Sequence, residues 1–246
     1  IKHIGLPFEI ERFAGPGDVA TLLKSRPPES HKGDFGRLLI VGGSETYSGA
    51  PTLAALAALR TGVDLVYIAS PRETSYAISS ISPDLITLKL EGDRLGRENL
   101  PVVKRFLEKA TAILIGPGLG LHRETQEAVR ELIKEVEERK IPMLLDADGL
   151  KAFSESKRRI STSVVFTPHT GEYRILTGKS LPENLDERAE MIRMTAQDLD
   201  AVLLVKAHVD IISDGYRTKL NFTGNPGMTV GGTGDVLSGI VGAFLA

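Results

Sequence analysis

Short apolar runs that alternate with helical patterns constrain the fold of this 246-residue chain more than any other feature. The alternation repeats about seven times, and runs such as residues 37–41 (RLLIV) and 112–115 (AILI) are apolar almost throughout. Strands of that kind belong in parallel sheets that are covered on both faces. We therefore predict a doubly wound α/β fold whose mainly parallel sheet carries helices on both faces. Residues 209–213 and 217–220 flank Asp214-Gly215 and predict an antiparallel hairpin at the edge of the sheet.

The domain organisation follows from where the periodic patterns begin. Residues 1–17 show no clear period, and we interpret them as a connector. Residues 18–246 form a single α/β domain in this interpretation. The composition, with 41% hydrophobic and 25% charged residues, is that of a globular domain large enough to bury a substantial core.

The composition excludes several classes of function. The net charge of -2 gives no electrostatic case for binding nucleic acid or an anionic membrane. No apolar run approaches the ~20 residues of a membrane-spanning helix, and the N-terminus lacks a signal-peptide pattern. The chain has no cysteine, so disulfides and thiolate metal ligands are excluded, and no second histidine has the spacing of a zinc site. We expect a cytoplasmic protein without a dedicated metal site.

Polar side chains collect just after the predicted strands. The carboxyl ends of parallel strands meet at one rim of a sheet, which is where open α/β sheets bind ligands. We therefore expect these side chains to lie on one side of the molecule. The residues concerned are Ser48, Asp146, Asp148, His169, Glu172, Lys206, Asp210 and Asp235.

A glycine-rich run, residues 225–239 (NPGMTVGGTGDVLSG), leads directly into an apolar helical pattern. Glycines allow tight turns whose amides converge, and the N-terminus of the following helix adds free N–H groups, so the run predicts an anion site. Asp235 stands at the start of this helix. A carboxylate there is poorly suited to bind phosphate but well suited to accept a proton from a hydroxyl that attacks phosphorus. A glycine-rich turn with Asp235 as the helix N-cap is the alternative.

Four other residues at the rim have their own interpretations. Lys206 fits either a nucleotide phosphate or an ion pair with a carboxylate. Asp146 and Asp148 each fit either water-mediated Mg²⁺ binding or capping of the helix that begins near Gly149, and capping is favoured for Asp148. His169, which follows Thr-Pro, is typical of a turn.

Common nucleotide and hydrolase motifs do not account for the chain. It has no P-loop and no G-x-S-x-G elbow, and the glycines of residues 116–120 lack the spacing of a nicotinamide-binding Rossmann fingerprint. The residues favour a nucleotide-dependent phosphoryl-transfer site, and they do not identify the acceptor.

The run GTGD before a helix, residues 232–235, is typical of the ribokinase-like superfamily. Within that superfamily the chain resembles the ADP/ATP-dependent NAD(P)H-hydrate dehydratases through six motifs in order between residues 32 and 246. Residues 1–17 resemble the end of the epimerase domain of bifunctional NAD(P)H-hydrate repair enzymes. The six motifs are GRLLIVGGSETYSGAPTLAALAALRTG, ILIGPGLG, LLDADGL, FTPHTGEYRIL, VKAHVDII and NPGMTVGGTGDVLSG.

The resemblance implies an enzyme that repairs nicotinamide cofactors damaged by hydration. ADP or ATP would phosphorylate the ring hydroxyl of hydrated NADH or NADPH, and elimination of phosphate, a better leaving group than hydroxide, would restore the dihydropyridine. Mg²⁺ is expected to bridge the nucleotide phosphates without a protein cage. The implied partners are the NAD(P)H hydrate, an adenine nucleotide, copies of the chain in a homotetramer, and a fused or separate epimerase. Family members usually continue past the last helix seen here, so we expect truncation at the C-terminus.

The resemblance also assigns roles to individual residues. Asp235 would be the catalytic base, and the backbone amides of Gly232, Thr233 and Gly234 would stabilise the developing charge. Contacts to the hydrated cofactor would come from Ala50, Gly118, His169, Glu172 and Asp235. Contacts to the nucleotide would come from Lys206, Ala207, His208, Val209, Asp210, Asn225, Gly227, Met228, Thr229, Gly231 and Gly234.

Two other functions remain open at this point. A small-molecule kinase of the same superfamily, acting on a vitamin-precursor alcohol, would share Asp235 and the glycine-rich loop but stop at the phosphorylated product. A non-catalytic nucleotide-binding subunit would have no need of Asp235, which the chain carries.

Overall fold

The strands that the structure describes form one mixed sheet. The computed structural model describes residues 11–23, 25–156 and 158–246, so most of the predicted connector lies outside the described residues. Within them, the nine-stranded sheet has the order β3-β2-β1-β4-β5-β6-β7-β8-β9. The strands are β1 (Arg37–Val41), β2 (Leu65–Pro71), β3 (Ile86–Leu90), β4 (Ala112–Ile115), β5 (Met143–Leu145), β6 (Val164–Phe166), β7 (Val202–Val205), β8 (Asp210–Ser213) and β9 (Thr218–Asn221).

The pairing of the strands confirms the predicted fold class. Strands β1 to β7 pair in parallel, and in register Ile40 of β1 lies between Ile68 of β2 and Leu114 of β4. Strands β8 and β9 form the predicted hairpin, which adds to β7 in antiparallel orientation at the sheet edge.

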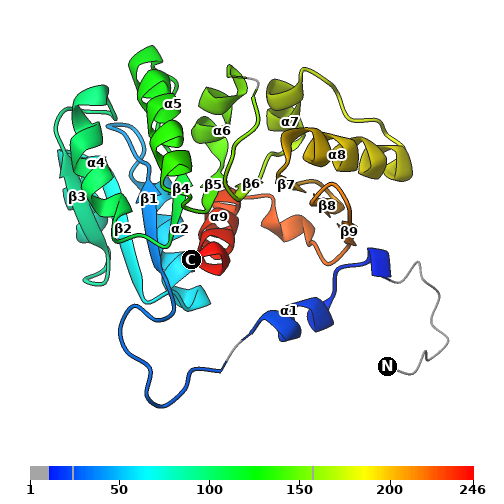
Figure 1. Cartoon of the computed structure of the whole chain (residues 1–246), viewed down its shortest axis with the longest axis horizontal. Coiled ribbons are helices and arrows are strands. Elements are labelled where there is room, and N and C mark those ends of the chain that lie inside the picture. The colour runs from blue at the N-terminus through cyan, green and yellow to red at the C-terminus, as the bar shows by residue number, and fades with distance from the viewer. Residues whose placement is uncertain (1–10, 24, 157) are drawn as a thin grey trace.

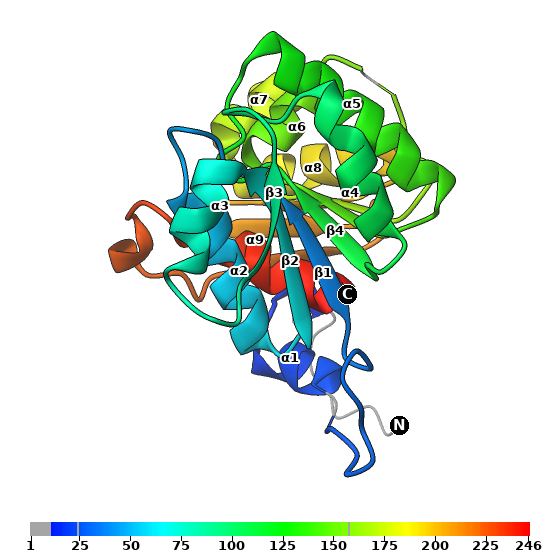
Figure 2. The ribbon, with the colours of Figure 1, turned by 90° about the vertical axis from the view of Figure 1, so that its left-hand side faces the viewer.

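Helices cover both faces of the sheet, as predicted. Figure 1 shows α4 to α8 above the sheet and α2 and α9 below it, and Figure 2 adds α3 to the lower layer. The helices are α1 (Pro16–Leu22), α2 (Gly49–Thr61), α3 (Arg72–Ser79), α4 (Leu100–Leu107), α5 (Arg123–Glu138), α6 (Ala147–Ser154), α7 (Thr170–Thr177), α8 (Leu185–Leu199) and α9 (Thr233–Leu245), with 3₁₀ helices η2 (Arg97–Asn99) and η3 (Pro226–Met228).

Each strand buries side chains on both faces, which explains the continuous apolar runs in the sequence. In β1, Leu39 joins the core beneath α4 to α8, whereas Leu38 joins the core against α2 and α9. Helix α5 shows the matching helical pattern, because Leu132 and Val136, one turn apart, are fully buried in the first core.

Helices α2 and α9 approach closely because small residues line their contact. A Cβ atom added to Gly239 would lie only 2.1 Å from the backbone carbonyl oxygen of Ala54. Ala54 and Ala58 of α2 are themselves fully buried in this layer. The alanine-rich contact face of α2 therefore brings α9 close to α2. This contact fixes the position of α9 and therefore of Asp235.

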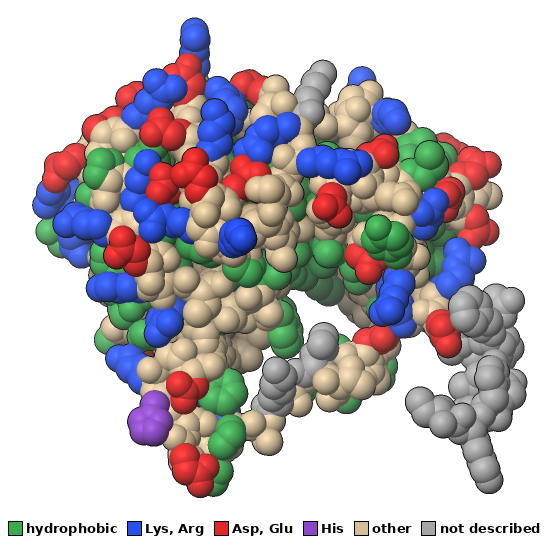
Figure 3. All heavy atoms as spheres, in the orientation of Figure 1, with side chains coloured by type: hydrophobic (Ala, Val, Ile, Leu, Met, Phe, Trp, Pro, Cys, Tyr) green, Lys and Arg blue, Asp and Glu red, His purple; other side chains and the backbone are tan. Residues whose placement is uncertain are grey.

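Residues 11–23 and 25–36, which precede β1, form an N-terminal arm that leaves the body of the molecule. Figure 3 shows a hollow between the arm and the body, with hydrophobic side chains on the body side. The arm is attached through Lys219, which pairs with Asp18, and through Asp64, which accepts a hydrogen bond from the N–H of Gly33. The predicted boundary after residue 17 falls inside α1 and stays a prediction. None of the helices that the structure describes has both the length and the apolarity to span a membrane.

Candidate active site

The turn into α9 requires glycine at position 232. Gly232 is the N-cap of α9 and has a φ of 93°, in the left-handed region that side chains disfavour. A Cβ atom there would also lie 2.5 Å from Cδ1 of Leu53 in α2. The N-cap reading of Asp235 is therefore wrong, because Asp235 is the third residue of the helix.

The N-terminus of α9 presents free hydrogen-bond donors. Within the described chain, the backbone N–H groups of residues 231–235 donate to no other residue, and the first helical bond runs from Val236 to Gly232. The Thr233 hydroxyl holds the preceding loop, since its oxygen lies 3.0 Å from the carbonyl oxygens of Met228 and Val230. Free N–H groups at the positive end of a helix are suited to an anion.

Asp235 sits beside these donors in a partly buried, acidic environment. Burial and the neighbouring Asp146 carboxylate raise the pKa of Asp235 to about 6, with a smaller contribution from Asp148, while the Lys206 ammonium acts in the opposite direction. The Asp235 side chain is half-buried. A carboxyl group with such a pKa exchanges protons near neutral pH, as a catalytic base must.

Asp146 is buried at the centre of this cluster and is only 2% exposed. Its Oδ1 accepts hydrogen bonds from the Thr167 hydroxyl at 2.8 Å and from Lys206 Nζ at 3.1 Å. Its Oδ2 accepts a short hydrogen bond from the Ser238 hydroxyl of α9. Asp146 occupies the N-cap position of α6 but makes no side-chain cap bond, so the capping alternative is wrong.

Asp148 does not cap a helix either. It lies in the first turn of α6, where its Oδ2 accepts a hydrogen bond of 2.8 Å from the N–H of Gly120 and its Oδ1 pairs with Lys151 at 2.9 Å. Asp148 therefore fixes the glycine turn that follows β4. In the same turn Gly118 faces Ala50, since a Cβ atom on Gly118 would lie 3.3 Å from that of Ala50.

His169 and Glu172 form a capping box at the start of α7. Nδ1 of His169 accepts from the N–H groups of Gly171 at 3.0 Å and Glu172 at 3.3 Å, and Glu172 Oε2 accepts from the N–H of His169 at 3.0 Å. His169 is therefore the N-cap of α7 and forms an isolated parallel bridge with Lys206, so its interpretation as a turn residue is wrong. Its ring is exposed, while Glu172 is buried. Lys206 Nζ lies 3.8 Å from Glu172 Oε2, so the lysine has two carboxylate neighbours.

The two predicted nucleotide-binding segments, residues 206–210 and 225–234, lie side by side. A Cβ atom on Gly234 would lie 3.6 Å from Lys206 Nζ, and one on Gly224 would lie 3.8 Å from the carbonyl oxygen of His208. The loop before α9 projects from the rim of the molecule in Figure 2.

Several predicted nucleotide contacts are not gathered around Lys206. The Asn225 side-chain oxygen accepts a hydrogen bond from the N–H of Gly227. Both residues are exposed along the loop, as are Met228 and Thr229. Val209 is buried in the core, and Asp210 accepts from the N–H of Ala207 and from the Asn221 side chain. Gly231 lines a hollow of about 270 Å³ whose other lining residues are Leu53, Met228, Gly232, Thr233, Val236, Leu237 and Ile240.

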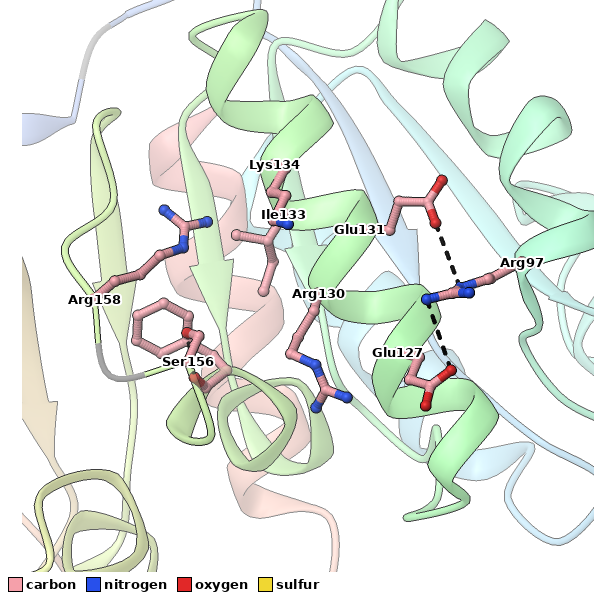
Figure 4. Close-up of a pocket in the computed structure, with 9 residues that line it drawn as sticks. Arg97, Glu127, Arg130, Glu131, Ile133, Lys134, Ser156 and Arg158 are labelled. Atoms are coloured by element: carbon pink, nitrogen blue, oxygen red, sulfur yellow. Dashed lines mark hydrogen bonds and ion pairs between the residues drawn. The ribbon is translucent and has the colours of Figure 1, made fainter.

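A larger surface hollow lies elsewhere, on the outer face of α5. It measures about 690 Å³ and is drawn in Figure 4. Arg97 pairs across it with Glu127 and Glu131, and Arg130 pairs with Glu155. None of the predicted site residues lines this hollow, so cavity size does not locate the site.

Two residues of the cluster were missed in the sequence. Ser238 is three residues after Asp235, which places both on one face of the helix, and it is the only polar side chain after Asp235 in α9. That spacing was a usable signal. Thr167 follows β6 at the rim, but nothing in the sequence indicated its bond to Asp146.

Comparison with known proteins places the chain in a family. The sequence profile of a family described as NAD(P)H-hydrate dehydratase matches residues 38–246. The chain belongs to the NAD(P)H-hydrate dehydratase family. The family resemblance predicted from the six motifs is thereby confirmed.

Individual relatives agree with this assignment. A bifunctional NAD(P)H-hydrate repair enzyme of Pyrobaculum aerophilum is 50% identical over 245 residues, which cover 100% of this chain and 48% of that protein. The chain thus spans about half the length of this relative. An ADP-dependent (S)-NAD(P)H-hydrate dehydratase of Cenarchaeum symbiosum is 39% identical over 96% of this chain and 81% of that protein.

A solved structure also agrees. The ADP/ATP-dependent NAD(P)H-hydrate dehydratase of Bacillus subtilis, co-crystallised with ATP and Mg²⁺, superposes with a TM-score of 0.75. It is 28% identical and covers 99% of this chain and 86% of that one.

Proposed function

We propose that the chain catalyses the nucleotide-dependent dehydration of hydrated NADH or NADPH back to NADH or NADPH. The observation that carries the proposal is the placement of Asp235, a carboxyl group with a raised pKa, beside the free N–H groups that begin α9. The family membership and the activities for which the relatives are named support the same reaction. ADP or ATP is the phosphoryl donor in this proposal.

In this mechanism Asp235 accepts the proton of the ring hydroxyl as the hydroxyl oxygen attacks the terminal phosphorus of the nucleotide. The bond from that phosphorus to the nucleotide breaks. The free amides of residues 232–234 and the Lys206 ammonium stabilise the charge that develops on the phosphoryl oxygens. The carbon–oxygen bond of the ring then breaks with phosphate as the leaving group, while the adjacent ring carbon loses a proton to solvent and the electrons of that C–H bond form the double bond of the dihydropyridine. Mg²⁺, when bound, neutralises phosphate charge.

The remaining site residues take the roles that the resemblance assigned to them. The free amides and the Lys206 ammonium beside Gly234 fit a phosphate group, which supports nucleotide binding at residues 206–210 and 225–234. The contact between Ala50 and Gly118 and the exposed ring of His169 support a pocket for the hydrated cofactor that also includes Glu172 and Asp235.

The pH dependence of the reaction follows from the pKa of Asp235. The base must be ionised, and its pKa in the free protein is about 6. We expect kcat/KM to fall about tenfold per pH unit below that value and to level off above it. Initial rates across buffers of constant ionic strength measure this profile. A profile flat down to pH about 4.5 would contradict the assignment of Asp235 as the base, because an Asp of raised pKa is protonated there.

The decisive test of the reaction uses hydrated NADH with ADP, or with ATP, in the presence of Mg²⁺. The near-ultraviolet absorbance of NADH is expected to return in proportion to the phosphate released. A reaction mixture without nucleotide is the control and should stay unchanged. Phosphorylation of a vitamin-precursor alcohol without any return of NADH absorbance would instead favour the small-molecule kinase.

We also propose that the chain works in the cytoplasm, in a homotetramer, together with a fused or separate epimerase. The bifunctional relatives, about twice as long as this chain, support the link to an epimerase. Light scattering of the purified chain tests the tetramer, and a monomer at assay concentration would overturn it.

A further inference from the structure

The buried carboxylate of Asp146 joins three elements of the site that are far apart in the sequence. Its donors are Thr167 after β6, Lys206 after β7 and Ser238 in α9. A buried carboxylate is costly unless it is paired and hydrogen-bonded, and here each oxygen has at least one donor. In the proposed reaction the proton is accepted by Asp235 and the phosphoryl charge is stabilised by Lys206 and residues 232–234, so Asp146 takes no direct part in the chemistry.

The hydrogen bond from Lys206 determines where its ammonium group lies. The lysine side chain is long and flexible, so its ammonium group can occupy many positions. Asp146 Oδ1 at 3.1 Å is the nearer of its two carboxylates, since Glu172 Oε2 is at 3.8 Å. In this position Nζ lies beside Gly234, at the free N–H groups of α9. Without the Asp146 charge, the ammonium would move toward Glu172, toward Asp235 or into solvent.

The hydrogen bond from Ser238 links the same carboxylate to the catalytic helix. The Ser238 hydroxyl lies close to Asp146 Oδ2 and 3.0 Å from the carbonyl oxygen of Gly234. A hydroxyl can donate only one hydrogen bond. A charged carboxylate is a stronger acceptor than a carbonyl oxygen, so the Ser238 hydroxyl donates to Asp146. Ser238 is three residues after Asp235, so this bond holds the helical turn that carries the base.

We propose that Asp146 is a positioning residue that holds the Lys206 ammonium at the N-terminus of α9, where the transferred phosphoryl group binds, and anchors the turn that carries Asp235. This inference rests on the proposed function, since it takes residues 206 and 232–235 to meet the nucleotide. Asp146 touches no substrate in this arrangement. Its effect is exerted through Lys206 and Ser238.

A double-mutant cycle tests the inference. Asp146→Asn keeps the shape of the side chain and removes its charge, and Lys206→Met removes the ammonium. Each single change is expected to weaken ADP binding, measured by calorimetry, by roughly 10-fold or more. If Asp146 acts through Lys206, the double variant binds ADP no more weakly than Lys206→Met alone. Losses that multiply in the double variant would overturn the inference.

Two further variants separate positioning from a general loss of structure. Asp148→Asn removes a carboxylate that also faces Asp235 but contacts Gly120 and Lys151, so its ADP affinity is expected to match the wild type. An equal loss of ADP affinity in Asp148→Asn would overturn the specific role of Asp146.

Ser238→Ala is expected to lower kcat by roughly 10-fold with ADP affinity retained, because it frees the turn of Asp235 and leaves Lys206 in place. Unchanged kcat in that variant would overturn the anchoring of the helix.

The ADP affinities still test the inference when a variant does not fold or when the proposed dehydration is not observed. If Asp146→Asn does not fold, Lys206→Met alone must weaken ADP binding, and unchanged affinity overturns the inference. A wild-type chain that binds ADP but never restores NADH refutes the proposed function while the ADP affinities still test Asp146. Normal turnover and normal ADP affinity in Asp146→Asn refute the inference alone.

Discussion

Replacing Asp235 with asparagine is expected to lower kcat of the proposed dehydration by roughly 100- to 10,000-fold, with ADP affinity retained. Asparagine keeps the size of the side chain but cannot accept the proton of the attacking hydroxyl. The N–H groups of α9 and Lys206, which are expected to hold the nucleotide, stay in place. Turnover of hydrated NADH and calorimetric titration with ADP measure the two quantities. Unchanged turnover would remove Asp235 as the base and favour a non-catalytic nucleotide-binding subunit.

The free energy of unfolding of Asp235→Asn shows whether misfolding causes the loss of activity. The folded-state pKa of Asp235 is raised from 3.8 to about 6, so between those values the folded protein holds the proton more tightly than the unfolded chain. Wild-type stability therefore falls as pH rises through that window, and the full cost is present above about pH 6. Asparagine has no such cost, and after allowing for solvent screening we expect the variant to gain about 1 kcal/mol at neutral pH. A loss of activity together with this gain in stability is the combined result that identifies a catalytic carboxylate.

The fold was predictable because short apolar runs in the sequence identify its strands. Strand β4, residues 112–115, is buried on both faces, so every one of its residues is apolar and the run stands out from its surroundings. The edge hairpin was predictable for a different reason, since Asp214-Gly215 supplies a local turn signal between two short runs. Local composition was sufficient in both cases.

The candidate site was predictable only where its residues lie close together in the sequence. Gly232 and Asp235 belong to one continuous run, and the helix that follows places them. The bond between Asp146 and Ser238 joins residues 92 positions apart, and nothing near either residue specifies the other. The same reason explains the error at Asp148, whose partner Gly120 belongs to a turn 28 residues earlier.

Gly239→Val is expected to destabilise the fold by about 3 kcal/mol or more, which for a domain of this size lowers Tm by roughly 10 °C. The Cβ of any side chain at position 239 would lie 2.1 Å from the carbonyl oxygen of Ala54, which belongs to the backbone of α2 and cannot rotate away. Helices α2 and α9 would have to separate, and both pack on the central strands of the sheet. Thermal unfolding followed by circular dichroism measures the change.

The control for this substitution is Gly49→Ala, at the start of α2. Gly49 is exposed, and a Cβ atom there meets nothing within 4 Å, so the change is expected to leave Tm the same or slightly higher. Helix α9 carries Asp235 on its first turn, so separation of the two helices must also displace the base. The fraction of Gly239→Val that stays folded is therefore expected to lose activity far beyond the loss of folded protein. A variant that keeps wild-type kcat would show that the close packing of α2 on α9 is not what positions Asp235.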